Sequence, residues 1–329
     1  MNNLKNIDKI LILDFGSQFT QLIARRIREN KVYSEIHPFN VSIDFIKNFG
    51  AKGIILSGGP SSVYEKDAPK INKELFELGI PILGICYGMQ LIVHSLGGKV
   101  EKAKKREYGN AEIKIIKNDR IFKSFEKNSV VWMSHGDSIK SIPKGFNLTA
   151  KTSNTNYGAI ENKEKNIYAI QFHPEVAHTK NGIKIIKNFI FDICKCKKNW
   201  NMDSFIEYQT KNIKEIVGDK NVILGLSGGV DSSVAAVLIE KAIGKKLKCI
   251  FVNTGLLRKN EEKKVIEVFR DNFKIDLIYK DGSKRFLNKL KGIKNPERKR
   301  KIIGKEFINI FEEEAKKIKN VGFLAQGTL

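Results

Sequence analysis

The stretch "PILGICYGMQ", from Pro81 to Gln90, is the most informative stretch in the first half of the chain. Its first five residues form a short apolar run, which is the pattern of a strand buried on both faces of a sheet. Cys86 follows, with a glycine two residues before it and another two residues after it, and a helical pattern begins directly behind. The stretch therefore predicts a strand, a tight turn that carries Cys86, and a helix.

Two other apolar runs have the same form and end on glycine: "KILILDFG" at residues 9–16 and "KGIILSGG" at residues 52–59. Between them, residues 17–30 repeat apolar side chains at helical spacing, and Ser17 can cap that helix. Strands that alternate with helices in this way predict an α/β fold with a mostly parallel sheet and helices on both of its faces. Further strands are expected at residues 129–135 and 167–175, and a further helix at residues 179–194.

A polar stretch without periodicity, "KCKKNWNMDSF", follows that helix and is typical of a linker between domains. We place the boundary near Asn199, which predicts a first domain at residues 7–199 and a second at residues 200–329. The second half repeats the alternation of strands and helices and predicts another mostly parallel sheet. Its last element, in "NVGFLAQGTL", is strand-like, and a buried parallel strand is rarely the last element of a domain. We therefore expect the second domain to be incomplete at Leu329.

The composition allows two packed domains, because hydrophobic residues make up 41% of the 329 residues. No apolar run is long enough to span a membrane and the first residues lack a secretory signal, so we expect a cytoplasmic protein without a membrane partner. The four cysteines do not form a disulfide framework in a chain of this length. The net charge of +23 is spread over the chain. We interpret its densest run, residues 295–305, as a solvated helix face in preference to a phosphate-binding patch, and we expect no nucleic-acid partner.

Cys86 has two interpretations. Most cysteines at the end of a strand are small core residues. The pattern G-x-C-x-G at a strand-to-helix junction is also the cysteine form of a nucleophile elbow, in which the glycines remove side chains that would clash with the turn. The following helix points its amino terminus at the sulfur, which stabilises the thiolate. The pattern on its own leaves both interpretations open.

A cysteine nucleophile needs a base and a group that orients the base. The stretch "QFHPE" places His173 and Glu175 two residues apart on an extended segment. If His173 faces Cys86, Glu175 can hold the other imidazole nitrogen, as in a catalytic triad. The alternative is an exposed His-Pro-Glu turn, and His178 is a weaker candidate for the base.

The stretch "LSGGP" ends another predicted strand and exposes the consecutive N–H groups of Gly58 and Gly59. Such a turn suits an oxyanion hole for acyl transfer, although a plain turn has the same sequence. Active sites of open α/β sheets form where parallel strands end. Three strand-end motifs on one sheet therefore predict one active site.

Together, "GICYGMQ", "SGGP" and "QFHPE" resemble the class I glutamine amidotransferases, over residues 7–196. The resemblance implies that Cys86 attacks the side-chain amide of glutamine, forms a glutamyl thioester and releases ammonia. His173 would transfer the proton and Glu175 would orient His173. The resemblance also implies a set of residues that bind the oxyanion or hold glutamine: Gly58, Gly59, Tyr87, Gln90, Ser134 and His135.

The second half begins with "VILGLSGGVDSSVAA", which predicts a strand, a glycine-rich loop and a helix. The loop lacks the lysine of a Walker A motif, yet N–H groups and hydroxyls at the amino terminus of a helix still form a phosphate site. Asp231 would repel phosphate unless Mg²⁺ lies between them. A bare glycine turn is the alternative. The residues expected to bind ATP are Ser227, Gly228, Gly229, Val230, Asp231, Ser232 and Ser233.

This loop resembles the pyrophosphate loop of N-type ATP pyrophosphatases, and the order of the two domains resembles glutamine-dependent ligases that aminate XMP to GMP. The resemblance implies the substrates glutamine, ATP and XMP, a need for Mg²⁺, the release of AMP and pyrophosphate, and a homodimer whose dimerisation part lies beyond Leu329. We therefore expect that these 329 residues alone form no GMP. Asn253 departs from the family, which often has aspartate there, so its part in the nucleotide site stays open.

Three alternatives remain. A glutamine-dependent NAD-synthesising enzyme would have a nitrilase-like glutaminase half with a Glu-Lys-Cys set, which is not seen here. A tRNA-thiolating enzyme usually has extra cysteines near its loop, whereas only Cys249 is nearby. A nucleic-acid-binding module is suggested by charge alone. Cys194 and Cys196 could bind a metal, but no second ligand pair with suitable spacing accompanies them, and we interpret them as structural.

Overall fold

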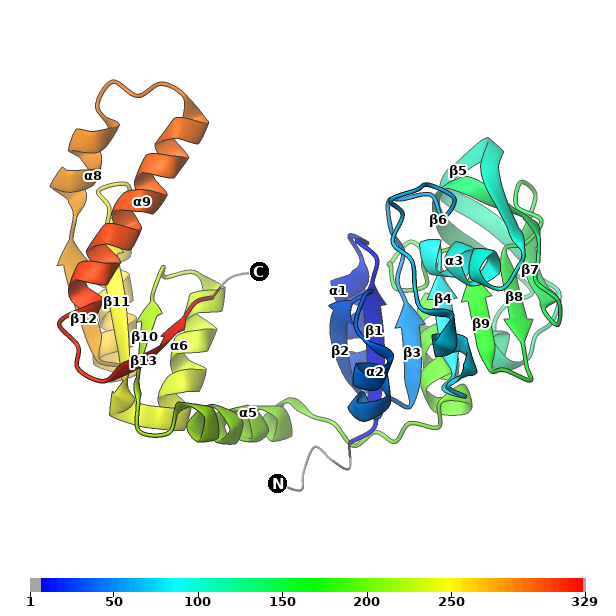
Figure 1. Cartoon of the computed structure of the whole chain (residues 1–329), viewed down its shortest axis with the longest axis horizontal. Helices are drawn as coiled ribbons and strands as arrows, with labels where there is room; N and C mark the ends of the chain where they lie inside the picture. The colour runs from blue at the N-terminus through cyan, green and yellow to red at the C-terminus, as the bar shows by residue number, and fades with distance from the viewer. Residues whose placement is uncertain (1–6, 328–329) are drawn as a thin grey trace. The chain divides into compact units, whose positions relative to one another are not determined.

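The structure, a computed structural model, describes residues 7–327 (Figure 1). These residues form two compact units that divide between Asn201 and Met202. The sequence places the domain boundary close by, near Asn199. Among the described residues, every helix is too short or too polar to cross a lipid bilayer.

A nine-stranded sheet forms the centre of the first unit, in the order β2-β1-β3-β4-β9-β8-β7-β5-β6. Its parallel part consists of β1 (Lys9–Asp14), β2 (Tyr33–Pro38), β3 (Gly53–Leu56), β4 (Ile82–Ile85) and β9 (Ile167–Ile170). Its antiparallel part joins through β9 and consists of β5 (Lys99–Ile115), β6 (Asn128–Ser141), β7 (Asn147–Thr152) and β8 (Ala159–Asn162).

The α/β class is therefore confirmed, but the first sheet is mixed, whereas the sequence pattern predicts a mostly parallel one. The apolar runs predict four strands of the parallel part, because parallel strands buried on both faces read as continuous hydrophobic runs. The pattern does not predict β5, whose sequence is rich in lysine and glutamate. Exposed and less exposed residues alternate along much of β6. The strand expected at residues 129–135 lies within β6 and is confirmed.

Helices cover both faces of the parallel part, as predicted, because successive strand residues point to opposite faces. One face packs against α1 (Thr20–Glu29), η2 (Arg120–Phe122), α4 (Gly182–Lys187) and the π-helical turn η3 (Asn188–Ile193). The other face packs against α2 (Ile43–Phe49), the 3₁₀ turn η1 (Lys73–Glu77) and α3 (Tyr87–Ser95). In β1, Ile10 and Ile12 belong to the first of these cores, and Leu11 and Leu13 belong to the second.

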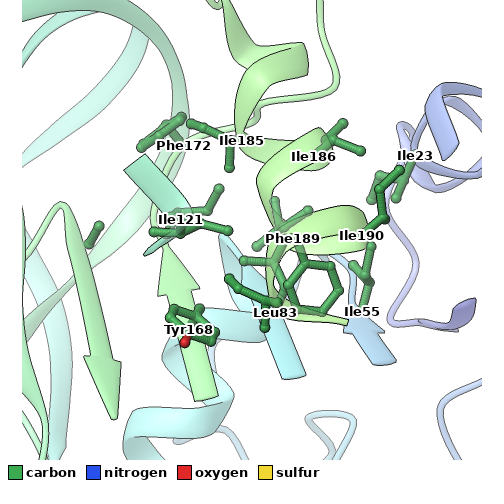
Figure 2. Close-up of a cluster of buried hydrophobic side chains, with 14 of the residues drawn as sticks. Ile23, Ile55, Leu83, Ile121, Tyr168, Phe172, Ile185, Ile186, Phe189 and Ile190 are labelled. Carbon is green, nitrogen blue, oxygen red and sulfur yellow. The ribbon is translucent and has the colours of Figure 1, made fainter. Parts of the chain in front are cut away.

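Figure 2 shows the core on the α1 face, where strand residues Ile55, Leu83 and Tyr168 lie near Phe189 and Ile190 of η3. All five side chains are fully buried. Full burial of an apolar side chain of this size contributes about 1.5–3 kcal/mol. This packing holds β3, β4 and β9 side by side, so that the turns at their carboxyl ends lie at one edge of the sheet.

The start of α1 differs from the prediction. The helix begins at Thr20, with Phe19 at its N-cap position, so the predicted cap by Ser17 is wrong. Ser17 Oγ instead accepts a hydrogen bond from the Phe19 N–H at 3.1 Å, within the turn that precedes the helix. The Thr20 hydroxyl donates to Asp14 Oδ1 at 2.6 Å and ties the helix start to the end of β1.

The second unit contains a four-stranded, fully parallel sheet in the order β12-β11-β10-β13. Its strands are β10 (Asn221–Gly225), β11 (Leu247–Asn253), β12 (Leu277–Asp281) and β13 (Val321–Ala325). One face packs against α5 (Met202–Val217), α6 (Val230–Ile243), α7 (Glu261–Ile266) and the π-helical turn η5 (Glu267–Asn272). The other face packs against α8 (Ser283–Leu290) and α9 (Pro296–Ala315), and a short turn, η4 (Gly244–Lys246), leads into β11. This sheet is the one that the sequence predicts.

The basic run at residues 295–305 forms the start of α9. Its lysine and arginine side chains are all exposed. Asn295 caps the helix by accepting a hydrogen bond from the Arg298 N–H at 2.9 Å, and Arg300 pairs with Glu297 at 2.9 Å. These features agree with the interpretation of the run as a solvated helix face.

Candidate active site and nucleotide-binding loop

Cys86 lies on the turn between β4 and α3, where its backbone adopts φ 54° and ψ −106°. A positive φ is uncommon for a residue with a side chain, and strain of this kind costs about 1–3 kcal/mol. Both flanking glycines are required. A β-carbon on Gly84 would lie 2.7 Å from the carbonyl oxygen of Gly88, and one on Gly88 would lie 2.3 Å from that of Leu56. The turn thus has the geometry of a nucleophile elbow.

His173 and Glu175 follow the end of β9, and both are buried. His173 Nδ1 lies 2.7 Å from Glu175 Oε1, which leaves Nε2 for the Cys86 thiol. The backbone also holds this segment, because the His173 N–H donates to the Trp132 carbonyl at 3.0 Å and the His173 carbonyl accepts from the Thr179 hydroxyl at 2.5 Å. The structure therefore brings together the three residues that the sequence predicts as a triad.

The charge state of His173 follows from its partners. Burial by itself lowers the pKa of His173, but hydrogen bonds with the Cys86 thiol and the Glu175 carboxylate outweigh burial and raise that pKa to about 10. The imidazolium therefore persists at neutral pH. An imidazolium beside a cysteine is the partner that a thiolate nucleophile requires.

The same contacts predict how stability depends on pH. The ordinary pKa of 6.5 applies to His173 in the unfolded chain, and the folded value is raised to about 10, so the folded state binds the proton more tightly. This stabilisation is fully present below pH 6.5 and is lost as the pH rises through about 10. We expect the free energy of unfolding of the unsubstituted chain, relative to a His173→Gln variant, to fall over this range in urea titrations. A difference that stays constant with pH would contradict the assignment.

After β3, Gly58 and Gly59 lie in a turn beside His173. A β-carbon on Gly58 would lie 3.1 Å from His173 Cε1. A β-carbon on Gly59 would lie 2.5 Å from the carbonyl oxygen of Phe15, in the turn after β1. Only glycine therefore fits at Gly59. The Ser57 carbonyl accepts a hydrogen bond from the Gly88 N–H at 3.0 Å, which ties the "SGGP" turn to the turn of Cys86.

A cavity of about 660 Å³ opens beside Cys86. Its wall contains five of the six residues predicted to bind glutamine or its oxyanion: Gly59, Tyr87, Gln90, Ser134 and His135. The sixth, Gly58, lies against His173. The wall also contains charged side chains of both signs that no sequence motif predicts: Glu65, Lys102, Arg106 and Asp137. A cavity with this mixture of charges suits a small zwitterion.

Gln171 contacts Cys86, and no sequence motif predicts this contact. Gln171 Nε2 lies 3.6 Å from Cys86 Sγ, and Gln171 Oε1 accepts a hydrogen bond from Gln90 Nε2 at 3.3 Å. Cys86 Sγ also lies 3.5 Å from the Ser134 carbonyl oxygen. The signal was present in "QFHPE", because residues 171 and 173 point to the same side of an extended segment.

Three weaker candidates of the first unit, His178, Cys194 and Cys196, lie outside the wall of this cavity. His178 is exposed, and its ring packs on Trp132 with 4.5 Å between the ring centroids. Cys194 and Cys196 are buried and free. Burial raises the pKa of Cys194 well above its ordinary value and that of Cys196 to about 12. Within residues 7–327, no group of three or more histidine, cysteine, aspartate or glutamate side chains could hold a metal ion.

An electrophilic glutamine analogue is therefore expected to modify Cys86 ahead of Cys194, Cys196 and Cys249. Thiols react as thiolates, and burial raises the pKa of Cys249 to about 12 as well, so these three buried thiols stay protonated at neutral pH. Peptide mapping by mass spectrometry identifies the adduct. In a His173→Gln variant, labelling should slow without moving to another cysteine. Preferential modification of any of the three buried thiols would overturn the assignment of Cys86.

The predicted phosphate loop joins β10 to α6. Gly228 has φ 78°, and a β-carbon there would lie 2.8 Å from Val265 Cγ2, so the loop needs glycine at this position. Ser227 Oγ and Ser232 Oγ lie 2.9 Å apart, and Ser232 Oγ also accepts from the Ser227 N–H at 3.2 Å. These bonds draw the loop into a turn at the amino terminus of α6, where unpaired N–H groups attract anions.

The remaining residues of the loop face outward. Val230 and Asp231, in the first turn of α6, are exposed. Gly228 and Ser233 form part of the wall of a largely apolar cavity of about 970 Å³, which also has cationic side chains such as Arg258. The loop is thus accessible and lies next to a space that is large enough for a nucleotide.

Asn253 ends β11, at the same edge of the second sheet as the phosphate loop. Its Nδ2 donates to Glu262 Oε2 at 2.6 Å, and its Oδ1 accepts from the Gly255 N–H at 2.8 Å. The Tyr279 hydroxyl donates to the same Glu262 oxygen at 2.9 Å. A carboxylate therefore lies beside Asn253, and no sequence motif predicts this cluster.

Two parts of the chain match families of known proteins. Residues 11–193 match the family Glutamine amidotransferase class-I, and residues 202–284 match the family NAD synthase. A solved structure from Thermoplasma acidophilum, described as one component of a GMP synthase, is 34% identical with a TM-score of 0.51 and covers 62% of this chain and 98% of that chain. The chain belongs to the class I glutamine amidotransferases.

Two relatives that match nearly the whole chain carry a more specific description than the family does. The glutamine-hydrolysing GMP synthase of Brachyspira hyodysenteriae is 78% identical over 324 residues, and that of Clostridium botulinum is 56% identical over 324 residues. Each match covers 98% of this chain but only 63% and 64% of the respective relative. The predicted resemblance is confirmed, and the chain spans slightly less than two thirds of the length of these GMP synthases.

Proposed function

We propose that Cys86 is the nucleophile of a glutaminase. The observation that carries the proposal is the series of contacts from Cys86 through His173 to Glu175 beside a cavity with charges of both signs. The thiolate attacks the amide carbon of glutamine, and the new C–S bond gives a tetrahedral intermediate with an oxyanion. As this intermediate collapses to the thioester, the C–N bond breaks and His173 gives its proton to the departing ammonia. With His173 as base, water then hydrolyses the thioester and releases glutamate and the free thiol.

The residues around the cavity receive roles in the same proposal. The N–H groups of Gly59 and Tyr87, with Gly58 shaping the turn, would stabilise the oxyanion of the tetrahedral intermediates. Their turns are tied together at Ser57, which supports this assignment. The rest of the predicted set would hold the glutamine itself: Gln90, Ser134 and His135.

The loop at residues 227–233 is proposed to bind the phosphates of ATP through its N–H groups and serine hydroxyls. Asp231 fits a Mg²⁺ site, because its carboxylate is exposed at the loop and Mg²⁺ is commonly held by one or two carboxylates together with substrate phosphates. Bound Mg²⁺ would neutralise phosphate charge that Asp231 otherwise repels. The apolar cavity beside Gly228 would exclude water from part of the nucleotide.

For the whole protein we propose the reaction of the GMP synthases that it resembles. ATP would adenylate an oxygen of XMP with release of pyrophosphate, and ammonia from the glutaminase would displace AMP to give GMP. The 78% identity to a glutamine-hydrolysing GMP synthase supports this reaction over others that use the same loop. Action in the cytoplasm and a homodimeric state are proposals that rest on the same resemblance.

The molecule that accepts the ammonia can be identified with glutamine that carries ¹⁵N in its side-chain amide. The experiment uses the protein expressed from its own gene. With ATP, Mg²⁺ and XMP, ¹⁵N is expected in GMP, together with AMP and pyrophosphate. The match of residues 202–284 to NAD synthase makes amidation of nicotinate adenine dinucleotide the second candidate. Transfer of ¹⁵N to that dinucleotide in preference to XMP would reverse the order of the two proposals.

A further inference from the structure

Glu107 is a buried carboxylate that the proposed chemistry does not use. Glu107 lies on β5, outside the wall of the cavity beside Cys86. Its oxygens accept hydrogen bonds from the last residue of β7 and from the loop that follows β7. Thr155 Oγ1 donates at 2.6 Å, Thr152 Oγ1 at 3.1 Å and Asn154 Nδ2 at 3.5 Å. A buried charge is retained only where partners compensate its loss of water. These contacts supply much of that compensation and hold the carboxylate in one place.

The remaining partner of Glu107 is His135 of the cavity wall. Glu107 and His135 are directly opposite each other in the antiparallel β5–β6 pair, and His135 Nε2 lies 3.4 Å from Glu107 Oε2. The other ring nitrogen, Nδ1, lies 2.8 Å from the Asp137 carbonyl oxygen. Because a carbonyl oxygen can only accept, Nδ1 carries a hydrogen. The contact between Nε2 and the carboxylate is an ion pair and not a hydrogen bond, and it attracts the ring when Nε2 carries a hydrogen as well. In that doubly protonated form the ring is held on both sides, by the backbone carbonyl and by the carboxylate.

Glu107 is charged at neutral pH. Burial on its own raises the pKa of Glu107, but the contacts with His135, Thr155 and Thr152 outweigh burial and lower that pKa to about 2. An ionised carboxylate behind an imidazole orients the ring, in the same way that a carboxylate orients the base of a catalytic triad.

The position of His135 also affects the nucleophile. Ser134 directly precedes His135 on β6, and its carbonyl oxygen lies 3.5 Å from Cys86 Sγ. The described contacts of Glu107 do not include the thiol itself, so its influence on the cavity passes through His135.

We propose that Glu107 is a positioning residue that sets the affinity for glutamine by holding His135 in the cavity wall. The proposal rests on the proposed glutaminase function, because it takes glutamine as the occupant of the cavity. Loss of the negative charge at Glu107 should weaken glutamine binding and leave the His173–Glu175 pair intact, since Glu107 has no described contact with either residue.

Glutamine affinity can be measured by calorimetry in a Cys86→Ala background, where no turnover occurs. Adding Glu107→Gln is expected to weaken binding by roughly ten-fold, because the neutral amide no longer attracts the protonated His135 ring. The matched control is Glu161→Gln, because Glu161 on β8 is also fully buried and does not line the cavity. The control should leave glutamine affinity unchanged.

A double-variant cycle separates positioning from general stability. If Glu107 acts through His135, Glu107→Gln should weaken binding little further in a chain that already carries His135→Gln. Additive losses, or an affinity unchanged by Glu107→Gln, would overturn the inference. Absence of glutamine binding to the Cys86→Ala chain itself would instead count against the proposed function.

A second variant covers the case in which Glu107→Gln does not fold. Thr155→Val removes the shortest hydrogen bond to Glu107 and keeps the carboxylate. It is expected to weaken glutamine binding by roughly five-fold, less than Glu107→Gln does, because the carboxylate keeps its charge and its other hydrogen bonds. A folded Thr155→Val chain with unchanged affinity would also overturn the inference.

Discussion

Replacing Cys86 by alanine is expected to lower the rate of glutamine hydrolysis by at least roughly a thousand-fold, because removal of a catalytic nucleophile leaves only binding and the oxyanion site. The thioester cannot form without the sulfur. Free ammonia bypasses that step, so amination of the acceptor with ammonium as nitrogen donor should persist in the protein expressed from its own gene. The expected result is a chain that loses glutamine as a donor and keeps ammonium.

Release of glutamate from glutamine, followed by chromatography, measures the first half of this prediction. Cys249→Ala is the matched control, because Cys249 is a buried thiol of β11 in the second unit and should leave hydrolysis unchanged. Hydrolysis by Cys86→Ala at a rate close to that of the unsubstituted chain would rule out a thioester at this residue. Loss of the ammonium-dependent reaction would show that Cys86 also supports the second unit.

Replacing Asp231 by alanine is expected to weaken binding of Mg²⁺-ATP by at least roughly ten-fold, since a contact with a charged group contributes about 1.5–3 kcal/mol. Asp231 is exposed in the first turn of α6, where an uncompensated carboxylate opposes phosphate binding. Without Mg²⁺, the same substitution should therefore leave ATP binding unchanged or strengthen it. This opposite response to the metal distinguishes a ligand of Mg²⁺ from a residue that only shapes the loop.

Calorimetric titration with ATP, with and without Mg²⁺, measures both affinities. Asp219→Ala is the matched control, because Asp219 is exposed and precedes β10 at the opposite edge of the sheet from the loop. An Asp231→Ala chain with the affinity of the unsubstituted chain for Mg²⁺-ATP would remove Asp231 from the proposed site.

The sequence predicts the local features of both units well, because short motifs determine them. Gly84, Gly88 and Gly228 are required by close approach of neighbouring atoms, so the turns are encoded where they occur. The apolar runs predict the central strands for a similar local reason: a strand buried on both faces must be hydrophobic at every position.

Most of the antiparallel part of the first sheet is not predicted by the pattern, which indicates a strand there only at residues 129–135, within β6. The strand β5 runs from Lys99 to Ile115 and contains many charged residues, so no periodicity distinguishes it from a loop. Its partners on both sides in the sheet, β6 and β7, supply the backbone hydrogen bonds that make it a strand. Pairing of that kind is a long-range property and leaves little trace in the sequence of one strand.

The motifs around Cys86, His173 and Glu175 are specific enough in combination to predict a candidate triad. Which further side chains meet around the cavity depends on the tertiary structure. Glu107 reaches His135 through the register of β5 against β6, and Gln171 reaches Cys86 because β9 lies beside β4. A motif determines a turn through the few residues that form it, whereas these contacts depend on how strands distant in the sequence pair and pack.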